Sequence, residues 1–151
     1  MPGHGENCRC HLRVWLQTAQ ERPFTTKIFR EADCAIYIVD VTKDVQETTE
    51  KVQSQKTMLD IECRENFVHI LAGNKIDLPQ ERKLTTIAGH EMARRLGMDR
   101  YVEICAIQNI EIRSTIEDLL LRLKSRQVQN QKRCRDSISL GTLGTYNRLS
   151  S

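Results

Sequence analysis

The chain has 151 residues, of which 39% are hydrophobic and 28% charged, and its net charge is +3. This composition is typical of a soluble globular protein with one domain and a buried core. No apolar run approaches the roughly 18 residues of a membrane span and no secretory signal is recognised, so we expect a cytoplasmic protein.

Four apolar runs predict β-strands, at residues 10–15, 34–41, 67–73 and 101–105. The middle two are nearly continuous in Ile, Val, Leu and Ala, which is typical of strands buried on both faces of a parallel sheet. The segments between the last three runs have apolar residues at the spacing of helices. The expected fold class is therefore α/β, with a mostly parallel sheet, flanking helices and right-handed crossovers.

Three helices are predicted from apolar spacing and end signals. The first is polar and begins after Asp44, and the second begins at Thr85 or Thr86 and stops at Gly97. The third carries an apolar stripe and should end at about Arg126. The stripe comprises Ile112, Ile116, Leu119, Leu120 and Leu123.

The C-terminal part of the chain is basic and loses apolar periodicity. From Arg122 to Ser151 there are seven Lys or Arg side chains and one acid, Asp136, a net charge of +6. We expect disorder from about residue 130. Such a tail can make weak contact with an anionic membrane, although a simple solvated tail explains the same composition. No nucleic-acid partner is expected.

The six cysteines predict reduced thiols rather than a disulfide framework, because they are scattered in a chain without a recognised secretory signal. The tightest group, His4, Cys8, Cys10 and His11, has soft metal ligands, but its spacing matches no common structural zinc site. No metal site is predicted there. The cysteines are Cys8, Cys10, Cys34, Cys63, Cys105 and Cys134.

The stretch "ILAGNKIDL" places Asn74, Lys75 and Asp77 directly after a predicted buried strand. In a parallel α/β sheet, ligands bind at the carboxyl ends of the strands. A carboxylate at Asp77 can accept the N1 and N2 hydrogens of guanine, which adenine cannot offer, and the Lys75 stem can cover the ring. The pattern therefore suggests a guanine-binding loop, but a surface turn is an alternative.

The order and spacing of five segments resemble those of small GTPases of the Ras superfamily, with the Rab branch most similar. The resemblance covers residues 10–125 and implies guanine-nucleotide binding and GTP hydrolysis in signalling or vesicle traffic, with effector or regulatory proteins as partners. The segments are "LRVW", "QER", "FREADCAIYIVDVT", "ILAGNKIDL" and "YVEICA".

Carried over by position, the resemblance implies a second part of the base site at Cys105, Ala106 and Ile107, where the family has Ser-Ala-Lys. The backbone N–H of Ala106 could still meet the base oxygen, because this contact needs no particular side chain. The lysine that packs beside the ribose is replaced by Ile107. Base binding is therefore expected to be weak.

The catalytic segment departs further from the family pattern. Gln20 stands where the family has the glutamine that orients the attacking water. However, Leu16 replaces the aspartate that helps to hold magnesium, and Ala19 replaces a glycine that meets the γ-phosphate. Magnesium binding is consequently doubtful, and Gln20 is expected to be non-productive.

The phosphate-binding pattern Gly-x-x-x-x-Gly-Lys-Ser/Thr does not occur in these 151 residues. We therefore expect a small-GTPase fold without its first strand, P-loop and first switch: a lead-in at 1–9, a partial GTPase domain at 10–127 and a basic tail at 128–151. No C-terminal prenylation motif is present. The alternatives are a nucleotide-independent pseudo-GTPase interaction module, or an incomplete gene product or splice form of an active GTPase.

Overall fold

The computed structural model describes the backbone of residues 14, 30–64 and 66–146, with side chains as far as residue 129. The strand expected at 10–15 lies outside this part of the chain apart from Val14. Gln20 and the His4 to His11 cluster also lie outside it. Their predicted roles therefore stay predictions.

The described chain folds into a three-stranded parallel sheet with helices on both faces. The strands follow the order β1-β2-β3, and their register sets Asp40 opposite Asn74 and Asn74 opposite Ile104. The predicted α/β class is confirmed. The elements are β1 (Cys34–Asp40), α2 (Val45–Glu62), β2 (Val68–Asn74), α3 (Thr86–Arg95), β3 (Arg100–Ile104) and α4 (Ile112–Tyr146).

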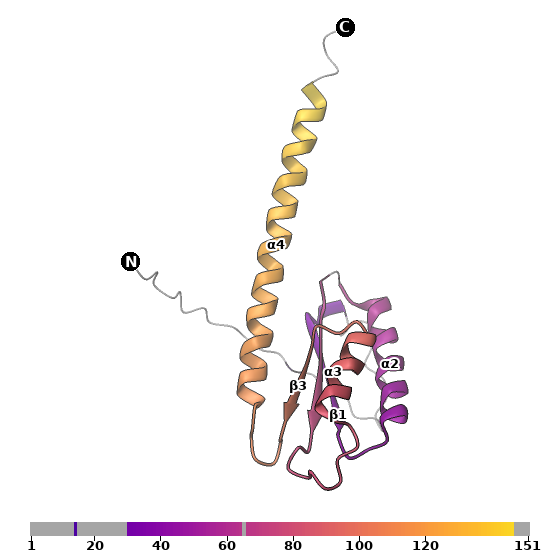
Figure 1. Ribbon diagram of the computed structural model, residues 1–151. Helices are drawn as coiled ribbons and strands as arrows, with labels where there is room; N and C mark the ends of the chain where they lie inside the picture. The colour runs from indigo at the N-terminus through magenta and orange to yellow at the C-terminus, as the bar shows by residue number, and fades with distance from the viewer. Residues whose placement is uncertain (1–13, 15–29, 65, 147–151) are drawn as a thin grey trace, which may run out of the picture.

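Strand alternation divides the core into two layers. Tyr37, Leu71 and Tyr101 face α2 and α3, whose buried residues join them in one apolar cluster. Val68 and Ile70 face the other way and pack with Leu119 of α4. Figure 1 shows α4 on the opposite side of the sheet from α2 and α3. Both faces of β2 are thus covered, as its continuous apolar sequence requires.

Both α2 and α3 begin after a capping side chain, and the cap of α3 is Thr85, one of the two threonines predicted for it. Asp44 precedes α2, and its carboxylate accepts a hydrogen bond from the Glu47 N–H at 2.9 Å. Thr85 precedes α3, and its hydroxyl accepts from the Ala88 N–H at 3.2 Å. After α3, Gly97 has a φ of 64°, a conformation that glycine adopts without steric cost.

The helix end predicted at about Arg126 is wrong, because α4 continues as helix to Tyr146 where disorder was expected. No Gly or Pro interrupts residues 112–140, and Gln, Lys and Arg are good helix formers. The loss of the apolar stripe marks the end of packing, not of the helix: Leu119 is buried, whereas Val128 is 45% exposed. Figure 1 shows the C-terminal half of α4 projecting away from the sheet. Among the described helices, none combines the length and apolar character needed to cross a bilayer.

Candidate nucleotide-binding site

The predicted base-binding residues lie on loops at the carboxyl edge of the sheet. Because β1, β2 and β3 are parallel and in register, the loops after Asp40, Asn74 and Ile104 emerge side by side. Figure 1 shows them together at the lower edge of the sheet. This is the edge at which parallel α/β sheets bind ligands.

Asn74 connects two of these loops. Its side-chain oxygen accepts a hydrogen bond from the backbone N–H of Ala106 at 3.0 Å. Its backbone carbonyl accepts from the Val41 N–H at 3.0 Å, which ties it to the end of β1. The Ala106 N–H predicted to meet a base oxygen is thus already paired, and it would have to share or exchange this bond on binding a base.

Asp77 is held in position by Cys105. The thiol of Cys105 donates to Oδ1 of Asp77 at 3.2 Å, and Cys105 itself is completely buried. A thiol is a weak donor, and each carboxylate oxygen can accept more than one hydrogen bond. Asp77 therefore keeps the capacity to accept the two guanine hydrogens while its orientation is fixed.

Lys75 makes an ion pair that was not predicted from the sequence. Its ammonium lies 2.7 Å from Oδ2 of Asp40. Oδ1 of Asp40 accepts from the backbone N–H and hydroxyl of Thr42 at 3.0 and 2.8 Å. Partial burial raises the pKa of Asp40, but the hydrogen bonds from Lys75 and Thr42 outweigh it, so the pKa is lowered overall. Asp40 could have been found from its position at the end of the neighbouring predicted strand.

The backbone at Lys75 has a φ of 70°, in the left-handed region that is uncommon for a side chain other than Gly, Asn or Asp. Such a conformation costs of order 1 kcal/mol or more and is held by surrounding contacts. Here those contacts include the Asp40 ion pair and a turn in which the Leu78 N–H donates to the Lys75 carbonyl at 3.1 Å. The loop conformation is therefore imposed by its neighbours.

Ile107 does not join this group of polar contacts. Its side chain is 86% exposed, on a loop that Cys105 and Ile110 close through an antiparallel bridge. The structure thus brings together Asn74, Lys75, Asp77, Cys105 and Ala106, and it leaves Ile107 in solvent. The water-positioning residue predicted at Gln20 lies outside the described residues.

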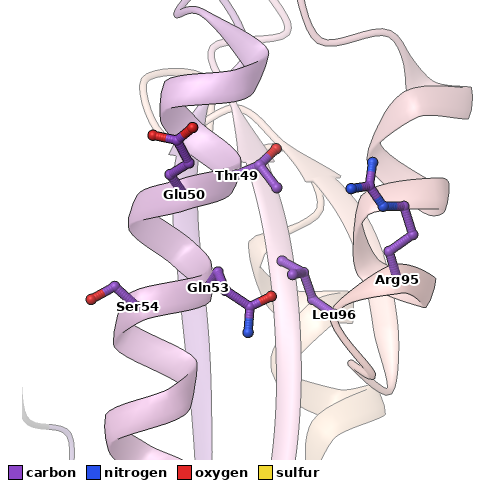
Figure 2. Close-up of a pocket in the computed structure, with 6 residues that line it drawn as sticks. All are labelled: Thr49, Glu50, Gln53, Ser54, Arg95 and Leu96. Atoms are coloured by element: carbon purple, nitrogen blue, oxygen red, sulfur yellow. The ribbon is translucent and has the colours of Figure 1, made fainter.

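A separate hollow of about 430 Å³ lies between α2 and α3, and none of the predicted site residues lines it. Gln53 and Leu96 point toward one another across this hollow in Figure 2. Its lining is mixed and supplies no converging set of ionised groups for a phosphate. The lining residues are Thr49, Glu50, Gln53, Ser54, Arg95 and Leu96.

A parallel α/β sheet with an Asn-Lys-x-Asp loop at its carboxyl edge defines the class of small-GTPase-like proteins. The sequence profile described as "Ras family" matches residues 4–125. The chain therefore belongs to the Ras family.

Several curated relatives belong to the Rab branch. The chain is 34% identical over 114 residues to the Ras-related protein Rab-3B of Rattus norvegicus and of Homo sapiens, covering 74% of this chain and 51% of each relative. It is 33% identical over 114 residues to Ras-related protein Rab-3C of Mus musculus, covering 74% of this chain and 49% of that relative. The chain spans about half the length of these relatives. The predicted Ras-superfamily, Rab-like resemblance is confirmed.

Proposed function

We propose that this chain binds GDP and GTP weakly through Asn74, Lys75, Asp77 and Ala106, as a guanine-nucleotide-binding member of a signalling or vesicle-traffic family. The observation that supports this proposal is the arrangement around Asp77. Cys105 orients the carboxylate, and Asn74 holds the adjoining loop through Ala106. A site whose polar groups are already oriented loses less entropy on binding a base.

We further propose that the 151-residue polypeptide does not hydrolyse GTP usefully. Phosphoryl transfer in this class depends on positioning and on charge stabilisation around the phosphates and magnesium. At the corresponding positions this sequence has Leu16 for an aspartate and Ala19 for a glycine. Gln20 could orient a water molecule, but it cannot supply the missing charge stabilisation. Magnesium is accordingly expected to contribute little to nucleotide binding.

Titration with fluorescent GDP and GTP, with and without magnesium, tests this proposal. We expect dissociation constants weaker than micromolar and no turnover above the uncatalysed rate. Asp77→Ala should abolish guanine binding, whereas Glu91→Ala removes an exposed acid on α3 and should leave it unchanged. Inosine diphosphate lacks the N2 amino group and should bind more weakly than GDP. Submicromolar affinity or measurable turnover would contradict the proposal.

A nucleotide-independent interaction module for an effector or regulatory protein is the second candidate. It is favoured by pairing within the protein at the carboxyl edge of the sheet, since the Asn74 side chain accepts from the Ala106 N–H and Asp40 forms an ion pair with Lys75. Thermal unfolding separates the two candidates. A nucleotide-binding chain should be stabilised by GDP, and Asp77→Ala should remove that stabilisation. A pure interaction module should show no shift with GDP in either form.

A further inference from the structure

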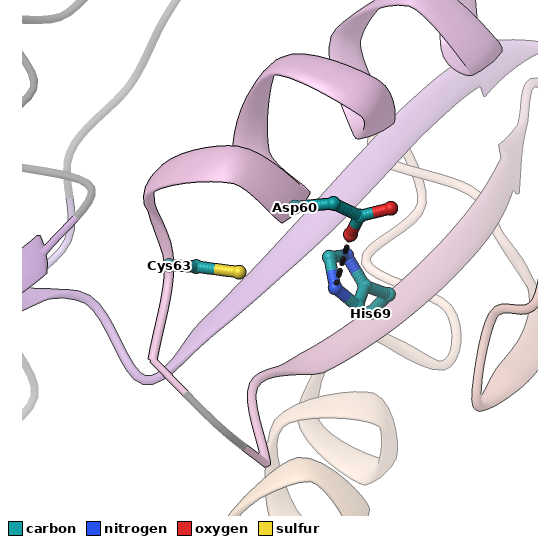
Figure 3. Close-up of side chains that lie close together, drawn as sticks. All are labelled: Asp60, Cys63 and His69. Atoms are coloured by element: carbon teal, nitrogen blue, oxygen red, sulfur yellow. Dashed lines mark ion pairs between the residues drawn. The ribbon is translucent and has the colours of Figure 1, made fainter.

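Three side chains with metal-binding atoms converge at the end of the sheet opposite the base-binding loops. They are Asp60 and Cys63 at the end of α2 and His69 near the start of β2. One ligand atom of each lies within 4.8 Å of the others. Figure 3 shows the Asp60 and Cys63 side chains directed toward the His69 ring. A carboxylate, a thiol and an imidazole are the three common zinc ligands of proteins.

The fold accounts for this convergence. Asp60 and Cys63 are three residues apart and so share one face of the last turn of α2. Cys63 ends the helix, and its N–H donates to the Leu59 carbonyl at 2.8 Å. His69 lies on the same face of β2 as Leu71, the face that α2 covers. The three residues therefore meet only because α2 packs on this side of the sheet.

The orientation of His69 suits a metal ligand. Only 7% of the residue is exposed, its Nδ1 lies 3.0 Å from the hydroxyl of Tyr37, and its Nε2 lies 3.3 Å from Oδ1 of Asp60. Burial, and then the nearby charge of Lys56, lower the pKa of His69. If Nδ1–H donates to the Tyr37 oxygen, the Nε2 lone pair faces Asp60 and Cys63, as in metal-bound histidines oriented by a second hydrogen bond.

The charged neighbours leave one side of Asp60 accessible. The Lys56 ammonium lies 2.6 Å from Oδ2 of Asp60, so Oδ1 is the oxygen that faces His69. Farther charges, the carboxylate of Asp99 and the guanidinium of Arg126, act on the His69 ring with opposite signs. A polar network that fastens α2 to β2 explains the Asp60 and His69 contacts equally well, but it gives no role to the Cys63 thiol.

We propose that Asp60 Oδ1, Cys63 Sγ and His69 Nε2 bind a zinc-type divalent transition-metal ion, with water in the fourth position. Binding forms a metal–sulfur bond as the Cys63 thiol proton passes to solvent. Metal–ligand bonds of about 2.0–2.3 Å place tetrahedral ligand atoms roughly 3.3–3.8 Å apart, so the site must contract by about 1 Å. This site is separate from the nucleotide site proposed above and independent of it.

Titration of the full, reduced chain with Co²⁺ tests the proposal. One equivalent should produce a tetrahedral cobalt spectrum with a thiolate charge-transfer band, and Zn²⁺ should displace it. Cys63→Ser should remove that band, and Asp60→Asn should weaken binding by about tenfold or more. Cys34→Ser is the matched control, since Cys34 packs on the opposite face of the sheet and should leave the spectrum unchanged.

A second measurement uses the unmodified chain and so does not depend on variant folding. Saturating Zn²⁺ should slow alkylation of Cys63 at least tenfold, as read by mass spectrometry of the peptides. An unchanged alkylation rate would overturn the proposal. A second result would also overturn the proposal: the cobalt charge-transfer band survives Cys63→Ser in a folded chain and disappears in a Cys8→Ser, Cys10→Ser double variant. The metal would then bind at the N-terminal cluster.

Discussion

Gly89 of α3 lies against the ring of Tyr101 on β3, and we predict that alanine at this position destabilises the fold although alanine is the better helix former. A Cβ added at Gly89 would lie 2.7 Å from Cε2 of Tyr101 and still closer to Cζ and Cε1. Tyr101 is buried on β3, and its hydroxyl donates to Glu103 at 3.2 Å, so the ring cannot move freely aside. Gly89→Ala should therefore strain the contact between α3 and β3.

The expected change in the free energy of unfolding for Gly89→Ala is the sum of a gain in helix propensity and a loss from overpacking. Replacing glycine by alanine inside a helix stabilises by about 1 kcal/mol. Overpacking a close contact costs about 1–3 kcal/mol, and the overlap with three ring atoms places Gly89→Ala at the upper end. We expect a net loss of about 2 kcal/mol in the free energy of unfolding. At about 4 °C per kcal/mol, this lowers Tm by roughly 8 °C.

Urea and thermal unfolding followed by circular dichroism provide the assay. In a Tyr101→Leu background the clash is relieved, so Gly89→Ala should become neutral or stabilising, a coupling of about 2–3 kcal/mol. Gly97→Ala is the control, because its Cβ would meet nothing within 4 Å and its cost comes from the positive φ alone. That cost should not depend on Tyr101. If Gly89→Ala stabilises the parent chain by about 1 kcal/mol, the close-contact argument is wrong.

Three further predictions concern polar contacts. Arg126 donates to the Asn66 carbonyl at 2.9 Å and forms an ion pair with Asp99. Arg126→Met should therefore lower the free energy of unfolding, measured by urea titration, by about 2 kcal/mol. No loss would show that α4 is held by apolar contacts alone. The lowered pKa of Asp40 means that its ion pair stabilises the fold above the unfolded-state pKa, and this contribution is lost as pH falls through the lower folded-state pKa. Asp40→Asn should therefore lower the free energy of unfolding at pH 7 but not at a pH below the folded-state pKa of Asp40. An equal loss at both pH values would show that ionisation of Asp40 does not contribute to stability. Cys105→Ala should weaken GDP binding about threefold to tenfold, whereas Cys105→Ser keeps a donor for Asp77 and should not weaken it. Equal losses of GDP affinity in the two variants would mean that the hydrogen bond from residue 105 does not orient Asp77.

Much of the fold could be predicted because its signals are local. The strands at 34–41 and 67–73 lie within one or two residues of β1 and β2, and Thr85 and Gly97 mark the ends of α3 as expected. These features depend on side-chain period and on capping chemistry, which neighbouring residues determine. The C-terminal end of α4 was predicted wrongly because apolar periodicity reports packing, whereas a helix can continue on propensity after packing ends.

The sequence alone determined the order of the described strands and helices, most of their bounds, and the position of the Asn-Lys-x-Asp loop after β2. Only the tertiary structure decided which distant side chains meet: Lys75 with Asp40, Cys105 with Asp77, and His69 with Asp60. Residues on different strands and helices come together through strand register and through the choice of sheet face that each helix covers. Those choices depend on how the whole core packs, and no local pattern records them.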